Sequence, residues 1–280
     1  MKSLFVKSLP GLIKKRRWGD KVTKAKLEFT HGGQVARIVL ASPKANILDW
    51  VMMSDLKAAF EELVPRRDLK AVVLIGDGPN FSYGASVQEH LPDQIANTLE
   101  KLHNLLLTVA RAPAPTIAAV HGQCLGGGFE LVLACDLVIA EENAQFGCPE
   151  IKLGVFPPAA SALLPEKIQR GWASSMVLTG ASWSGATAAQ CGLVSRTTAI
   201  AGLDEGLARW LESDFLPRST AALRHTAHAI RRPLVRALEE DLTVLERMYL
   251  DELMAEPDAI EGIQAFLEKR QPQWGSPRLT

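Results

Sequence analysis

The stretch that decides the fold covers residues 116–136 and reads TIAAVHGQCLGGGFELVLACD. Its first five residues are apolar or β-branched and predict a buried strand, and the apolar run at 129–135 predicts a helix. Between them lies a turn with three consecutive glycines, Gly126 to Gly128, where the backbone can approach another group closely. A strand that enters a helix through such a turn is typical of α/β proteins.

The amides at the start of this predicted helix have no acceptor within the helix and lie at the positive end of its dipole. We therefore expect the backbone around Gly127 to bind negative charge that develops on a ligand. Glycine turns between strands and helices also serve packing alone. The turn by itself leaves both interpretations open.

Alternating strand and helix patterns extend outward from this stretch in both directions. On its N-terminal side we expect strands at 26–30, 34–40 and 70–75 and helices at 51–64 and 93–111. On its C-terminal side we expect short strands at 137–140, 144–146 and 193–197, with helices from residue 157 to about 270. The predicted fold class is α/β with a helical C-terminal segment.

Composition indicates a globular chain. Its 280 residues are 47% hydrophobic and 22% charged, and no apolar run approaches the ~20 residues that a membrane span needs. Residues 1–26 carry nine basic side chains and one acidic one, whereas the rest carries 22 basic against 30 acidic. An acidic body disfavours nucleic acid as a partner.

We divide the chain into a basic extension (1–26), an α/β core (27–200) and a helical segment (201–280). The extension is interpreted as a solvated tail, with a targeting peptide as the alternative.

The four cysteines stand far apart, without a CxxC pair or a neighbouring histidine pair. This spacing supports neither a zinc site nor a disulfide framework, so we expect no metal. Buried reduced thiols are the ordinary state of such residues in the cytoplasm, which is the predicted location.

Two glutamates lie in apolar surroundings, Glu130 in the first turn of the predicted helix and Glu150 directly after Pro149. Carboxyl groups in such places suggest a general acid/base pair. We hypothesise that the helix end favours the charged form of Glu130, which then orients or deprotonates water, and that apolar neighbours favour the neutral form of Glu150, which then donates a proton. The alternative is that each carboxyl caps a helix or pairs with a basic group.

Three separately spaced motifs resemble the enoyl-CoA hydratase (crotonase) family: AAVHGQCLGGGFEL at 118–131, AQFG at 144–147 and PEIKLG at 149–154. The resemblance spans about residues 27–272. It implies a crotonase (ClpP-like) fold of repeated ββα units, whose helical C-terminal segment forms homotrimers that commonly pair into hexamers. It also implies an acyl-CoA thioester as substrate, so coenzyme A comes with the substrate and no separate cofactor is expected.

The resemblance also assigns roles to individual residues. The amides of Ala85 and Gly127 would bind the thioester oxygen, and Glu130 and Glu150 match the two glutamates of the family's hydratases. Substrate contacts are implied for a further set, in which Lys269 has a solvated helix end as its alternative: Lys44, Ala45, Asn46, Ser86, Val87, Gly126, Pro149, Phe156 and Lys269.

Two departures from the family pattern border the expected acyl pocket. Ser86 stands where an Asp is common, and VFPPAAS at 155–161 replaces a glycine-rich stretch. Together with PKANILD at 43–49, FSYGASVQEHLP at 81–92 and YLDELM at 249–254, they resemble a narrower branch. That branch adds water to cyclohexa-1,5-diene-1-carbonyl-CoA in benzoyl-CoA degradation and gives 6-hydroxycyclohex-1-ene-1-carbonyl-CoA. The alternatives are a general hydratase of fatty-acid β-oxidation and a non-catalytic relative that binds acyl-CoA or RNA.

Overall fold

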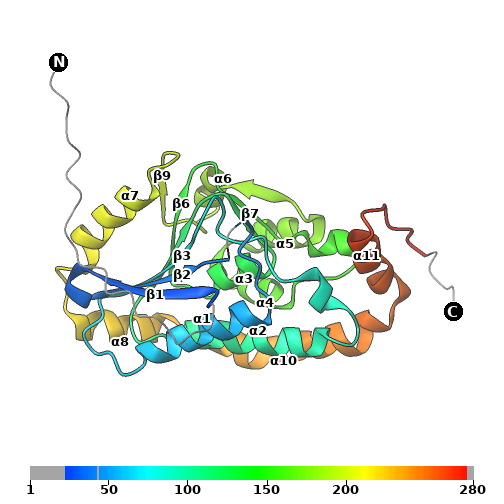
Figure 1. Cartoon of the computed structure of the whole chain (residues 1–280), viewed down its shortest axis with the longest axis horizontal. Coiled ribbons are helices and arrows are strands. Elements are labelled where there is room, and N and C mark those ends of the chain that lie inside the picture. Colours follow the sequence, from blue (N-terminus) through cyan, green and yellow to red (C-terminus); the bar gives the residue numbers. More distant parts are fainter. Residues whose placement is uncertain (1–22, 43, 276–280) are drawn as a thin grey trace, which may run out of the picture.

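The main sheet lies at the centre of the molecule. The computed structural model describes residues 23–42 and 44–275, so most of the predicted basic extension lies outside the described residues. Within them six strands follow the order β1-β2-β3-β4-β6-β9 (Figure 1). The first pair is antiparallel and the other neighbours are parallel. The strands are β1 (Ala25–Thr30), β2 (Val35–Leu40), β3 (Ala71–Gly76), β4 (Thr116–Val120), β6 (Leu137–Glu141) and β9 (Arg196–Thr198).

Both faces of this sheet are buried, as parallel sheets require. Along β3, Val72 and Leu74 belong to the larger core cluster, which also contains the apolar faces of α1 (Trp50–Leu63) and α2 (Ile95–Ala110). The alternate positions of β3 face a second cluster under α7 (Leu203–Trp210), on the opposite side of the sheet (Figure 1). The predicted strands and helices of this part are confirmed to within a few residues.

A second, smaller sheet of three strands contains β5 (Gln123–Leu125), β7 (Gln145–Gly147) and β8 (Ser182–Ser184). The sequence did not predict β5 or β8, because three residues show too little alternation to be recognised. The chain repeats a unit in which a strand of the main sheet is followed by a strand of the small sheet and then by a helix. One such unit contains β4, β5 and α3 (Gly127–Leu133). This is the predicted repeated ββα architecture.

Helices dominate the chain after β7. No helix within residues 23–42 and 44–275 is long and apolar enough to cross a membrane. β9 starts later than predicted, because the amides of Leu193 and Val194 instead bind the carbonyl of Ala188 at the end of α6. The α-helices that follow α3 are α4 (Pro158–Lys167), α5 (Arg170–Thr179), α6 (Gly185–Gln190), α7, α8 (Thr220–Ile230), α9 (Arg232–Arg236), α10 (Leu242–Arg247) and α11 (Pro257–Leu267).

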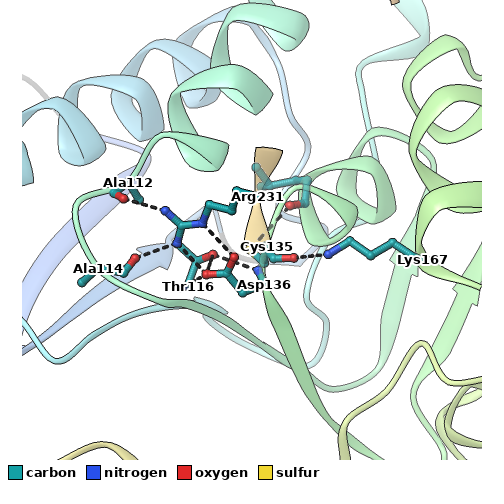
Figure 2. Close-up of polar contacts among 8 residues, drawn as sticks. Ala112, Ala114, Thr116, Cys135, Asp136, Lys167 and Arg231 are labelled. Carbon is teal, nitrogen blue, oxygen red and sulfur yellow. Dashed lines mark hydrogen bonds and ion pairs between the residues drawn. The ribbon is translucent and has the colours of Figure 1, made fainter. Parts of the chain in front are cut away.

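A buried ion pair fastens the C-terminal helices to the core (Figure 2). Arg231, between α8 and α9, is 2% exposed, and its Nε donates to Oδ1 of Asp136 over 2.7 Å. Its other donors reach the carbonyls of Ala112 (2.6 Å) and Ala114 (2.7 Å), just before β4. Asp136 also accepts from the amide of Thr116 over 2.7 Å. Burial of the pair is tolerated because hydrogen bonds satisfy both partners.

Replacement of Arg231 by Met should lower the free energy of unfolding by roughly 3–5 kcal/mol, because Asp136 would keep a buried charge without its partner. Urea-induced unfolding measures this loss. Arg270→Met serves as the control, since Arg270 pairs with Glu261 and Glu268 at the surface. Exposed pairs of this kind contribute only about 0–1 kcal/mol. Equal losses in the two variants would contradict the assigned role of Arg231.

Candidate active site

Two backbone segments, residues 82–85 and 125–128, cross in direct contact at the C-terminal ends of the central strands. The amide of Leu125 donates to the carbonyl of Ser82 over 3.0 Å. A Cβ on Gly84, whose φ is +98°, would lie 2.7 Å from the carbonyl oxygen of Leu125, and a Cβ on Gly128 would lie 2.6 Å from the Ser82 side chain. Only glycine allows this approach.

The crossing brings the amides of Ala85 and Gly127 together. A Cβ on Gly127 would lie 3.2 Å from the Ala85 nitrogen, so the two backbone segments leave little room between them. Within residues 23–42 and 44–275, neither amide N–H has a hydrogen-bond acceptor. Gly127 is also the first residue of α3, where the helix dipole favours negative charge. The pair therefore offers two free donors of the kind that can bind a developing oxyanion.

The loop before α1 supports this crossing. Asn46 is 1% exposed, and its side-chain nitrogen donates to the carbonyls of Asp77 and Asn80, both over 2.9 Å. The backbone carbonyl of Asn46 accepts a hydrogen bond from the Ser82 hydroxyl over 2.8 Å, and the backbone carbonyl of Ala45 accepts one from the Tyr83 amide over 2.9 Å. The Asn46 side chain is thus used to hold the segment that leads to Ala85.

Both free amides open into a narrow cavity of about 80 Å³. Five of the sequence-predicted site residues do not line it: Lys44, Ala45, Asn46, Ser86 and Lys269. The other eight do: Ala85, Val87, Gly126, Gly127, Glu130, Pro149, Glu150 and Phe156. The structure therefore brings together the predicted oxyanion and carboxyl residues and most of the predicted acyl-pocket residues. Ser86, which was expected at the acyl pocket, does not line this cavity, and neither do the residues expected to contact coenzyme A.

Glu130 is buried on α3, and its Oε1 accepts a hydrogen bond from the amide of Ala160 over 2.8 Å. Burial raises the pKa of this carboxyl, while the Ala160 amide lowers it. The expectation that a helix end would favour its charged form is therefore wrong in sign, because burial outweighs the helix end. The capping alternative holds in part, since Ala160 lies in the first turn of α4. Sequence reasoning missed Ala160 because this contact spans 30 residues.

Glu150 lies in the short 3-10 helix Pro149–Leu153, and its Oε2 is buried without a hydrogen-bond partner in the part of the chain that the structure describes. Burial and, secondarily, the charge of Glu130 raise the pKa of Glu150 to about 8. The predicted neutral form at neutral pH agrees with this direction. Gly126 makes room for the group, since a Cβ there would lie 2.7 Å from Oε1 of Glu150.

This arrangement defines a class of enzyme. Two free amides can stabilise the enolate oxygen of an acyl thioester, and two carboxyls of unequal environment can deprotonate water and supply a proton beside it. An apolar cavity strengthens both effects, because charges interact more strongly where water is excluded. The fold and site together are those of a hydro-lyase that acts on acyl thioesters.

Comparisons with known proteins agree. The enoyl-CoA hydratase/isomerase family model matches residues 30–277, so the chain belongs to this family. The cyclohexa-1,5-dienecarbonyl-CoA hydratase of Thauera aromatica is 42% identical over 250 residues, 89% of this chain and 96% of the relative. The 2,3-dehydroadipyl-CoA hydratase of Escherichia coli (strain K12) is 36% identical over 86% of this chain and 95% of its own length. An enoyl-CoA hydratase structure from Mycobacterium avium subsp. paratuberculosis K-10 matches with a TM-score of 0.80 at 26% identity, over 91% of this chain and 100% of that chain.

The predicted crotonase family, its fold and the hydratase class are confirmed. Three polar residues of the cavity were not predicted from the sequence: Tyr83, Thr98 and Tyr249. His90, which the motif at 81–92 offers as an acyl-pocket residue or as an ordinary loop histidine, also lines the cavity. The ring Nδ1 of His90 lies 2.8 Å from the carbonyl of Ser86, whose own side chain does not cap the following turn. Tyr249 lies over a hundred residues from the glycine turn. The motif at 249–254 contributes to the family resemblance, but it does not indicate that Tyr249 lines the cavity.

Substitution of Gly84 by Ala should reduce kcat at least about tenfold, because the added Cβ forces residues 82–85 away from Leu125 and separates the two amides. Gly78→Ala is the matched control. Gly78 also has a positive φ, +82°, but nothing lies within 4 Å of an added Cβ. Steady-state kinetics of the folded variants compare them. An equal effect of both substitutions would show that backbone strain, not the crossing, explains the loss.

The stability of the chain should respond to the ionisation of Glu150. Its folded pKa of about 8 lies above the ordinary 4.5, so its favourable contribution is complete below pH 4.5 and is lost as the pH rises through about 8. Glu150→Gln cannot ionise and should gain roughly 4 kcal/mol over the original chain between about pH 5 and pH 9. Urea unfolding at both pH values measures this gain. The exposed Glu142→Gln should show none, and a pH-independent difference for Glu150→Gln would refute the raised pKa.

Proposed function

We propose that this chain adds water to cyclohexa-1,5-diene-1-carbonyl-CoA and gives 6-hydroxycyclohex-1-ene-1-carbonyl-CoA, as part of benzoyl-CoA degradation. The observation that carries the proposal is the carboxyl pair Glu130 and Glu150, buried in one apolar cavity beside the free amides of Ala85 and Gly127. The choice of substrate is supported by the relative from Thauera aromatica, which is a cyclohexa-1,5-dienecarbonyl-CoA hydratase by name.

The chemistry follows from the conjugation of the substrate. The thioester oxygen accepts hydrogen bonds from Ala85 and Gly127, which draws electrons from the ring. Glu130 takes a proton from water, whose oxygen bonds to the ring carbon β to the thioester, and the negative charge spreads from the oxygen to the vinylogous γ carbon. Glu150 gives its proton to that γ carbon, which leaves a double bond conjugated with the thioester. One water is added in total.

The roles of the two carboxyls follow from their surroundings. Burial raises the pKa of Glu130, but the hydrogen bond from Ala160 opposes this shift and supports the charged form that a base needs. Glu150 has no such donor among the described residues, and its raised pKa keeps it protonated at neutral pH, which suits an acid. An apolar wall that includes Val155 and Phe156 suits a ring better than a free carboxylate or an alcohol.

Residues outside the cavity are proposed to bind coenzyme A and to form the interface between subunits. We infer that Lys44, with the backbone of Ala45 and Asn46, and Lys269 at the C-terminal end of α11 contact the coenzyme A part of the substrate, and that no separate cofactor takes part. We also infer a homotrimer or a hexamer built from two trimers, supported by the exposed apolar side chains of Val244 and Met248 on the C-terminal helices. Free cysteines support a cytoplasmic location.

Hydration of cyclohexa-1,5-diene-1-carbonyl-CoA beside crotonyl-CoA tests the proposal. We expect a higher kcat/KM for the cyclic diene and a loss of kcat by about 100-fold or more in both Glu130→Gln and Glu150→Gln. Glu142→Gln, at the exposed end of the main sheet, should keep full activity. A higher kcat/KM for crotonyl-CoA would overturn the cyclic substrate in favour of a linear one, and the proposed roles of the two carboxyls would stand. Absence of hydration of either thioester would overturn the proposed function.

A further inference from the structure

The hydroxyl of Tyr249 is buried and has no partner. Tyr249 lies in the C-terminal helical segment, at 1% exposure, and within residues 23–42 and 44–275 no hydrogen-bond partner reaches its oxygen. Its ring packs against Phe156, with centroids 5.4 Å apart, in a cluster of aliphatic side chains. A phenylalanine would make the same contacts. An unsatisfied buried hydroxyl costs free energy, so packing alone does not explain it.

This hydroxyl belongs to the same cavity as the two carboxyls. Tyr249 lines the cavity together with Glu130 and Glu150, and the charges of Glu150 and then Glu130 add to burial in raising the pKa of its hydroxyl. It therefore stays neutral near neutral pH and can donate a hydrogen bond. Oε2 of Glu150 is a second buried oxygen without a partner in the described residues. Two unsatisfied polar atoms in one cavity call for a polar group of the ligand.

We propose that Tyr249 is a third polar residue of the reaction, whose hydroxyl donates a hydrogen bond to the oxygen atom that is added to the substrate. That oxygen belongs to the attacking water in hydration and to the alcohol group in the reverse reaction. This inference rests on the hydratase activity in the proposed function, and it does not depend on whether the acyl group is cyclic or linear.

The position of Tyr249 explains why the donor is useful there. The attacking water gives one proton to Glu130 and must keep a fixed orientation while it does so. A donor on the neighbouring wall fixes the oxygen without competing for that proton, because a neutral phenol in this environment does not act as a base. The side chains packed around Tyr249 are largely aliphatic, and in such a low-dielectric environment a hydrogen bond is electrostatically stronger than in water.

Tyr249→Phe removes this oxygen alone and tests the inference. We expect kcat to fall at least about tenfold and KM to change less than about threefold, because the donor acts on the water rather than on the bound thioester. The unfolding temperature should stay equal or rise, since an unsatisfied hydroxyl is lost. Thr198→Val is the matched control. Its hydroxyl is also buried without a partner in the described residues, but it lies on β9 and does not line the cavity.

Ligand binding gives a second readout that a purely structural role would not change. The original chain should bind 3-hydroxybutyryl-CoA more tightly than butyryl-CoA. The Kd for butyryl-CoA divided by the Kd for 3-hydroxybutyryl-CoA should fall by roughly three- to tenfold in Tyr249→Phe. Thr198→Val should leave it unchanged. Unchanged kcat and an unchanged ratio in Tyr249→Phe would overturn the inference, as would equal binding of the two thioesters by the original chain.

The kinetic test uses whichever thioester the original chain hydrates, so the two proposals can fail separately. Slow hydration of the cyclic diene by the original chain, with rapid hydration of crotonyl-CoA, refutes the proposed substrate and leaves Tyr249 to be judged on crotonyl-CoA. A full kcat in Tyr249→Phe on the preferred thioester refutes the role of Tyr249 and leaves the substrate assignment intact.

Discussion

The site depends on one contact between backbones, the crossing of residues 82–85 with residues 125–128. Glycine is required there by distance, because a Cβ on Gly84 or Gly128 would lie within 2.7 Å of the opposing segment. The crossing aligns two free amides, and the adjoining Gly126 leaves room for the carboxyl of Glu150. The two free amides and the Glu150 carboxyl are therefore positioned by close backbone contacts that only glycine permits, and the Asn46 loop supports these contacts through its hydrogen bonds.

Buried polar groups in this molecule differ in whether their hydrogen bonds are satisfied. Asp136 and Arg231 are fully paired, and their hydrogen bonds hold the C-terminal helices against the ends of β4 and α3 (Figure 2). In the cavity, Oε2 of Glu150 and the hydroxyl of Tyr249 have no partner in the described residues. The satisfied network stabilises the fold, whereas the unsatisfied atoms cost stability, and in our proposals they are used to bind the substrate.

Most of the fold could be predicted from the sequence, because long periodic segments such as α1, α2 and β4 report their burial locally. The three-residue strands β5 and β8 escaped prediction since they are stabilised by pairing with β7, not by their own pattern. Within the site, the glycine turn and both glutamates could be recognised. The direction in which the pKa of Glu130 is shifted could not be predicted, because it depends on how deeply the tertiary structure buries the carboxyl.

The sequence by itself determined the α/β class and the family, and it identified the glycine turn and the two glutamates that the structure places in one cavity, because these lie in short motifs. Only the tertiary structure decided which groups face one another. Ala160 reaches Glu130 across 30 residues, and Tyr249 joins the cavity from the C-terminal helices. Such contacts depend on how distant segments pack, and their energies come from burial and geometry, which no local pattern of residues contains.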